Sequence, residues 1–138
     1  MSEVFLPWAP TPDRDSQPWW DALAAGEFQL QRCSDCAALR WPARAICNRC
    51  RSFECEWERQ DGAGTVASWV RTHQAFAPAL REVVPYRVVQ VRLYVQDDLL
   101  LVGGWISDRE PVFEEAVALE IVEGADGFRV PCWRGVRE

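Results

Sequence analysis

The first periodic stretch of apolar residues in the chain has helical spacing. Trp19 and Leu23 lie four positions apart, and Trp20 and Ala24 form a second such pair beside the first. Residues four apart share one face of a helix, so this spacing predicts a helix over residues 13–25. The helix presents two adjacent tryptophans. We expect them to pack either on the chain's own core or against another subunit.

Beyond residue 60 apolar residues alternate with polar ones, which is the spacing of half-buried strands. The clearest strand covers residues 86–95, with one face formed by Val89, Val91, Leu93 and Val95. Further strands are expected at residues 28–32, 65–73, 99–106, 117–122 and 129–134.

The five strands after residue 60 predict a small closed or partly closed barrel, and the OB-fold is the common five-stranded case. An open sandwich would require more strands. Gly103 and Gly104 predict a bulge or sharp bend in this barrel. Residues 52–60 are expected to be a polar connector, and residues 74–85 a long apolar loop.

Two CxxC pairs, Cys33-Ser-Asp-Cys36 and Cys47-Asn-Arg-Cys50, are separated by ten residues. Each pair forms a tight turn that presents two thiolates, and two such turns supply the four ligands of a tetrahedral zinc ion. We therefore expect a structural Zn²⁺ site. A catalytic zinc is not expected, because four thiolates leave no open position for water.

Two other interpretations of the cysteine pairs compete with zinc. The same spacing holds iron in rubredoxin-like redox sites, although such turns often carry glycine where this chain has Ala37 and Arg51. The four thiols could also be free of metal. Two further cysteines lie outside the pattern: Cys132 is expected to be a small core residue, and the sequence assigns no role to Cys55.

The fold class expected from these patterns is mainly β, with an N-terminal helix, a rubredoxin-like zinc ribbon and a five-stranded OB-fold barrel. The expected division of the chain is residues 1–27 for the arm and helix, 28–58 for the ribbon, and 59–138 for the barrel.

The amino-acid composition disfavours nucleic-acid binding and excludes one class of enzyme chemistry. The 15 basic residues against 21 acidic ones give a net charge of −6, which repels a nucleic-acid backbone. All basic residues are arginine, so Schiff-base chemistry, which needs lysine, is excluded. The chain contains no apolar run of membrane-spanning length and no export signal, so we expect a cytoplasmic protein.

No catalytic constellation is predicted. His73 is the single histidine and has no nucleophile motif around it. Glu114 and Glu115 are adjacent in sequence and do not form a paired-carboxylate site. The Gly62-Ala63-Gly64 stretch lacks the remaining glycines and the helix of a phosphate-binding loop.

Two features outside the cysteine pairs are candidate contact sites. Four arginines near the cysteines either bind phosphates such as those of coenzyme A or form a solvated face, and the second interpretation is favoured; they are Arg40, Arg44, Arg49 and Arg51. The apolar loop 75–80, with Phe76 and Leu80, either lines an acyl channel, contacts a partner or covers one end of the barrel. Together with Trp19, Trp20 and Arg44, these two residues are the candidate partner or acyl-CoA contacts.

The order of these features resembles a bacterial and archaeal family of OB-fold proteins with a rubredoxin-like zinc ribbon that is associated with acyl-CoA metabolism. The stretches that carry the resemblance surround the two cysteine pairs. They are Trp19-Trp20 with Gly26, Leu30-Gln31-Arg32-Cys33, Trp41-Pro42-Ala43-Arg44, Gly62-Ala63-Gly64-Thr65-Val66 and Pro85-Tyr86.

The resemblance implies a non-catalytic accessory subunit that stabilises a thiolase-like enzyme and helps form its substrate channel. The enzyme would be a retro-aldolase of steroid side-chain CoA thioesters or an acyltransferase, in some cases with an enoyl-CoA hydratase as a further partner. Two alternatives remain open. One is a stand-alone acyl-CoA-binding protein. The other is a single-stranded nucleic-acid-binding module that stacks bases on Tyr86 and Tyr94, which the charge of −6 disfavours.

Overall fold

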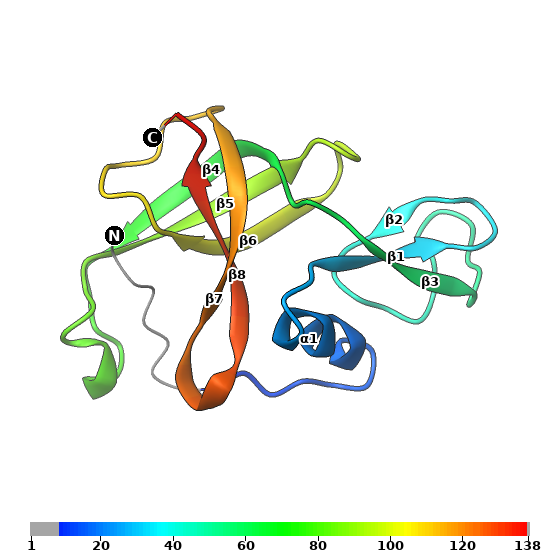
Figure 1. The fold of residues 1–138 in the computed structure, drawn as a ribbon, viewed down its shortest axis with the longest axis horizontal. Coiled ribbons are helices and arrows are strands. Elements are labelled where there is room, and N and C mark those ends of the chain that lie inside the picture. The colour runs from blue at the N-terminus through cyan, green and yellow to red at the C-terminus, as the bar shows by residue number, and fades with distance from the viewer. Residues whose placement is uncertain (1–8, 138) are drawn as a thin grey trace.

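The computed structural model describes residues 9–137, so the first eight residues of the predicted N-terminal arm lie outside the described part. The fold is mainly β, as predicted (Figure 1). Its elements in chain order are α1 (Gln17–Ala24), β1 (Gln29–Cys33), β2 (Leu39–Arg40), β3 (Cys55–Arg59), β4 (Gly64–Thr72), η1 (Pro78–Leu80), β5 (Tyr86–Leu93), β6 (Leu100–Trp105), β7 (Ala116–Glu123), η2 (Ala125–Gly127) and β8 (Arg129–Gly135).

Strands β4 to β8 form the predicted five-stranded barrel, closed in the order β4-β5-β6-β8-β7. Neighbouring strands are antiparallel except β6 and β8, which run parallel. The inward-facing residues of the barrel are apolar and fully buried, and they include Val66, Val89, Val91, Leu101, Val117 and Trp133. Side chains therefore fill the interior, as is usual for a small barrel.

The cysteine-containing segment forms a separate three-stranded sheet in the order β2-β1-β3. Figure 1 shows this sheet to one side of the barrel, with α1 lying where the two meet. The polar connector predicted at residues 52–60 is wrong, because residues 55–59 form β3 and pair along the whole of β1. The alternation of Cys55 and Trp57 with glutamates was too short a signal to separate a strand from a loop.

Helix α1 begins four residues later than predicted. Asp13 and Ser16 bond each other, with the Ser16 N–H donating to Asp13 Oδ1 at 2.7 Å and the Asp13 N–H donating to Ser16 Oγ at 3.1 Å. This closed turn occupies the residues that were expected to start the helix. The helix ends before Gly26, whose φ of 83° is readily adopted only by glycine.

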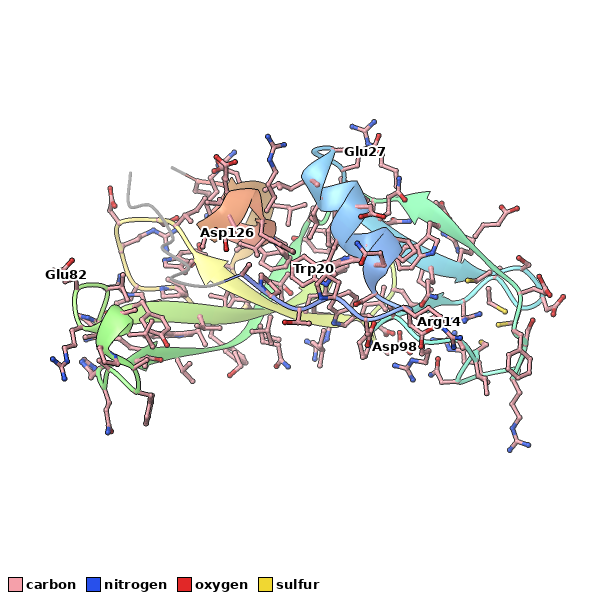
Figure 2. The ribbon with its side chains drawn as sticks, turned by 90° about the horizontal axis from the view of Figure 1, so that it is seen from below. Arg14, Trp20, Glu27, Glu82, Asp98 and Asp126 are labelled. Atoms are coloured by element: carbon pink, nitrogen blue, oxygen red, sulfur yellow. The ribbon has the colours of Figure 1, made fainter. Side chains whose placement is uncertain are left out.

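The two tryptophans of α1 pack within this chain. Trp19 is only 5% exposed, so it belongs to this chain's own core, which is the first of the two expected placements. Its ring lies 4.8 Å from that of Trp41 in the cysteine-containing segment. Trp20 is half-buried and meets Phe128, just before β8, at 5.7 Å (Figure 2). The helix therefore joins the ribbon to the barrel through aromatic contacts.

The bulge predicted at Gly103 and Gly104 is found elsewhere. The β5–β6 register is continuous through both glycines, whereas the β4–β5 register shifts between Val66 and Ser68. Gly103 is required for packing, because a Cβ at this position would lie 2.4 Å from the ring of Trp133. The sequence signal was thus a close approach between two strands rather than an extra residue.

Strand β5 follows the predicted alternation except at its end. Val89, Val91 and Leu93 are buried, but Val95 is 50% exposed and lies beyond the last residue of the strand. Among residues 9–137, no helix has the length and apolar character needed to cross a bilayer.

Candidate metal centre

The two CxxC pairs fold into matching turns, which we call the first and second knuckle. In the first, the Cys33 N–H donates to the Ala38 carbonyl at 2.8 Å, and the Ala37 N–H donates to the Cys33 carbonyl at 3.0 Å. The second knuckle repeats both bonds, at 2.9 and 3.0 Å, with Cys47, Ser52 and Arg51. Each turn therefore presents its two thiols in the same way.

The four sulfur atoms converge on one point. All lie within 4.8 Å of one another. The Sγ–Sγ distances are 3.5 Å for Cys33 and Cys50 and 3.6 Å for Cys36 and Cys47. Four sulfurs at about 2.3 Å from a tetrahedral zinc would be about 3.8 Å apart, so the spacing fits the ion. One cysteine of each knuckle is buried and the other is exposed.

The pKa shifts of the cysteine thiols in the two knuckles also favour binding of a cation. Backbone N–H groups of Cys36 and Asp35 lower the pKa of Cys33 to about 6 against the cost of burial. The pKa of Cys47 is lowered in the same way by N–H groups of its own knuckle. The N–H of Ser52 acts to lower the pKa of Cys50, but the hydrogen bond with Cys33 and burial raise it to about 12.

It follows that Cys33 and Cys50 do not both ionise unaided, because the thiolate of one opposes the ionisation of the other. A divalent cation removes this opposition by neutralising the charge that accumulates. With four thiolates bound, the tetrahedral shell is complete and leaves no position for water or substrate. The arrangement can organise the chain around a metal, but it cannot activate a water molecule.

Two of the four arginines near the cysteines bind backbone carbonyls of their own segment. Arg40 is 2% exposed, and its guanidinium donates to the carbonyls of Arg44 and Glu54 at 2.9 and 3.4 Å. Arg44 donates to the Trp41 carbonyl at 2.8 Å. The favoured interpretation of a solvated face is therefore wrong for Arg40, which is buried against the loop between the knuckles.

The ribbon is fixed to the barrel by residues that no sequence pattern singles out. The side chain of Gln96, in the turn between β5 and β6, accepts from the Leu39 N–H at 2.9 Å and donates to the Leu39 carbonyl at 2.8 Å. Asp98 of the same turn pairs with Arg49 at 2.7 Å. Figure 2 labels Asp98 on the side of the barrel turned toward the ribbon. A single glutamine in a polar turn gives no pattern from which this contact could have been found.

The other candidate contacts lie far from the knuckles. Phe76 is 77% exposed and Leu80 is half-buried, both in the segment that contains η1. Figure 1 places η1 at the end of the barrel opposite the ribbon. The structure therefore does not bring Phe76 and Leu80 together with Arg44, whose guanidinium already binds backbone carbonyls.

The acidic residues considered for catalysis have structural partners. Glu115 accepts from Arg109 at 2.7 and 2.9 Å, and this pairing lowers the pKa of the Glu115 carboxyl. Glu114 adopts a positive φ of 65° in the same turn. His73 is exposed just after β4. Within residues 9–137, the four cysteines are the group of His, Cys, Asp and Glu side chains placed to hold a metal.

A strained backbone at both knuckles leads to a testable prediction. Ala37 and Arg51 have φ values of 65° and 66°, a region that costs non-glycine residues about 1 kcal/mol. We expect Ala37→Gly and Arg51→Gly each to raise the free energy of unfolding of the zinc-loaded protein by ~1 kcal/mol, measured by urea denaturation. Ala45, an exposed residue between the knuckles without a positive φ, is the matched control. Ala45→Gly should not stabilise, and equal gains at all three positions would contradict the prediction.

Comparison with known proteins agrees with this geometry. Residues 20–56 match the family described as "ChsH2, rubredoxin-like zinc ribbon domain". Among curated proteins, none has a significantly similar sequence. Residues 20–56 are therefore similar to the zinc ribbon of that family, and the expected cofactor, a structural zinc ion held by the two knuckles, is confirmed.

Two solved structures are similar over nearly the whole chain. A chain of the "Ltp2-ChsH2(DUF35) aldolase" is 27% identical with a TM-score of 0.82, covering 92% of this chain and 98% of that one. A DUF35-family protein of unknown function from Sulfolobus solfataricus is 14% identical with a TM-score of 0.58, covering 88% and 85%. The first confirms the predicted family resemblance, and the second shows the shared fold.

Proposed function

We propose that this chain is a non-catalytic accessory subunit that binds and stabilises a thiolase-like acyl-CoA enzyme. The observation that carries the proposal is the likeness, over 92% of this chain, to a chain of an aldolase assembly that contains ChsH2. Under this proposal the partner carries out retro-aldol cleavage of steroid side-chain CoA thioesters or acyl transfer, and this subunit helps form the substrate channel. An enoyl-CoA hydratase is a further partner in the proposed assembly.

The chemistry of the described residues supports a role without catalysis. The tetrathiolate site is closed, Glu115 is paired with Arg109, and His73 stands exposed at a strand end. The four thiols are committed to metal binding, and the Glu115 carboxylate is committed to its ion pair with Arg109. A subunit of this kind contributes by binding, so the thiolase-like partner would hold the reacting groups.

The same structure disfavours the alternative of a stand-alone acyl-CoA carrier. Trp133 and the other core residues fill the barrel, which leaves its interior unable to hold an acyl chain. A surface hollow does exist beside β1 and β3, but Glu56 and Glu58 line it, and the one arginine in its lining, Arg32, is already paired with Glu58. Carboxylates at this position would repel the phosphates of coenzyme A.

We propose the segment around η1 as a contact with the partner. Phe76 is among the most exposed large apolar residues of the described chain at 77%, and burial of such a ring gives a protein interface much of its binding energy. Leu80 is the last residue of η1 and is half-buried. Trp20 and Arg44 are assigned to the chain's own packing in this proposal.

Co-expression with the thiolase-like enzymes encoded nearest to its gene tests the assignment. We expect one of them to co-elute with this chain and to show acyl-CoA cleavage or transfer that it lacks when expressed alone. Phe76→Asp should weaken the complex by about tenfold or more. Val102→Asp, at an exposed position on the outer face of β6, should leave affinity unchanged. Separate elution of both proteins, with full activity of the enzyme alone, would contradict the proposed function.

The assembly is assigned to the cytoplasm as part of this proposal. The chain has six cysteines, all of them free of disulfides in the structure. A reducing compartment keeps such thiols available to zinc.

A further inference from the structure

Cys55 is a fifth cysteine of the ribbon that the zinc site does not use. It lies on β3 directly opposite Cys33 of β1 in the antiparallel register. The N–H of Ser34 donates to the Glu54 carbonyl at 3.0 Å, and the N–H of Gln60 donates to the Phe28 carbonyl at 2.8 Å. Residues 34 and 54 therefore form a hydrogen-bonded pair, and so do residues 28 and 60. Bonded and non-bonded pairs alternate along an antiparallel ladder, so Cys33 and Cys55, one step from residues 34 and 54, form a non-hydrogen-bonded pair.

Opposed residues in a non-hydrogen-bonded pair point to the same face of the sheet, with Cα atoms about 4.5 Å apart. The position of the sulfur agrees with this, because the Gln31 side-chain amide contacts Cys55 Sγ at 3.6 Å. Gln31 lies two residues before Cys33 and so shares its face. Disulfides span Cα distances of about 4.4–6.8 Å, so the backbone already holds these two cysteines within bonding range.

The thiols of Cys33 and Cys55 differ in burial and in metal binding. Cys33 is a buried zinc ligand, whereas Cys55 is half-buried and outside the group of four sulfurs that converge on the metal. A small oxidant can therefore reach Cys55 without first displacing the zinc. Each ligand thiolate shares an electron pair with the zinc, and Cys132 is buried, so Cys55 is the partly exposed thiol outside the metal site.

We propose that Cys55 is a redox partner of the zinc ligand Cys33, and that peroxide converts the pair to a cross-strand disulfide with release of the metal. In the first step the Cys55 sulfur takes one oxygen of hydrogen peroxide and becomes a sulfenic acid, releasing one water. In the second step the Cys33 thiolate leaves the zinc and attacks the Cys55 sulfur. The S–S bond forms, and the sulfenic oxygen takes a solvent proton and leaves as water.

The overall change oxidises two thiol sulfurs by one electron each and reduces one peroxide to two waters. Three thiolates remain around the metal after Cys33 departs. Loss of a ligand lowers zinc affinity, and a ribbon that depends on its metal loosens when the ion leaves. Reduction of the disulfide by a thiol, followed by zinc, would restore the site.

The proposal is tested on the full-length, zinc-loaded chain treated with hydrogen peroxide, with released zinc measured by a chromogenic chelator. Cys55→Ser should release zinc several-fold more slowly than the natural sequence. Cys132→Ala, which alters a buried thiol of the barrel, is the matched control and should release zinc at the natural rate. Both variants should contain one zinc per chain before oxidation, and Cys55→Ala serves in place of the serine variant if that variant does not fold.

Peptide mapping identifies the bond itself. Trypsin cleaves at Arg32, Arg40, Arg51 and Arg59, so residues 52–59 carry Cys55 as their one cysteine. We expect this peptide to be linked to residues 33–40, with fragmentation placing the bond on Cys33 rather than Cys36. Zinc release from Cys55→Ser at the natural rate would overturn the proposal. So would a disulfide between two zinc ligands that leaves peptide 52–59 unlinked.

Discussion

Replacing Cys36 with serine is expected to abolish tight zinc binding and to unfold the ribbon. The four sulfurs lie within 4.8 Å of one another, and a serine hydroxyl does not replace a thiolate in such a site. Structural zinc contributes about 10–16 kcal/mol of apparent binding free energy to small ribbons, so loss of one ligand removes most of what holds the knuckles together. Zinc content and near-ultraviolet circular dichroism measure the two effects.

The consequences should extend beyond the ribbon. Trp41 lies between the knuckles and contacts Trp19 of α1, so disorder in the ribbon exposes the helix. We therefore expect Cys36→Ser to lower solubility and complex assembly together. Cys55→Ser, in the same sheet but outside the metal site, should retain one zinc per chain. A Cys36→Ser protein that is soluble and assembles normally yet abolishes turnover would show that the metal acts in catalysis rather than in structure.

Replacing Trp133 with alanine should have the second largest effect, because this residue fills the centre of the barrel. Its side chain is fully buried, and its indole N–H donates to the Gly62 carbonyl at 2.9 Å. Removal of a buried tryptophan typically costs about 3–5 kcal/mol, and here it also leaves a buried carbonyl unpaired. Urea denaturation should therefore show a loss of ~4 kcal/mol or a chain that does not fold.

The matched control for Trp133 is an aromatic residue on the surface. Phe113 is 63% exposed, so Phe113→Ala should change the free energy of unfolding by less than about 0.5 kcal/mol. Zinc content separates barrel damage from ribbon damage, since the knuckles do not contact Trp133 through any described bond. A Trp133→Ala protein as stable as the Phe113→Ala protein would contradict the closed, filled barrel.

Sequence patterns predicted the positions of the barrel strands, and the prediction was sharpest where one face of a strand is buried. The alternation in β5, for example, maps onto Val89, Val91 and Leu93, which are all buried. The metal site was equally accessible to prediction, since four cysteines at fixed spacing have few other uses. Both signals lie within short stretches of sequence. The alternation in a strand reflects burial of one face, and the cysteine spacing reflects coordination of a metal.

The features that escaped prediction depend on contacts between distant segments. Strand β3 is defined by its pairing with β1 rather than by its own composition. Gln96 reaches Leu39 across 57 positions, and Arg40 is buried only because two carbonyls meet its guanidinium. The sequence allowed Trp19 to pack either in this chain's core or against another subunit. The contact between Trp19 and Trp41 places it in the core.

Mixing the two purified proteins tests the proposal that this chain assembles with a thiolase-like enzyme that holds the reacting groups. Size-exclusion chromatography with light scattering reports assembly, and acyl-CoA turnover is measured on the same fractions. We predict a stable hetero-oligomer whose turnover is unchanged by His73→Ala in this chain and is lost when the partner's nucleophile is removed. Turnover by this chain alone, or two separate peaks with a fully active partner, would contradict the account.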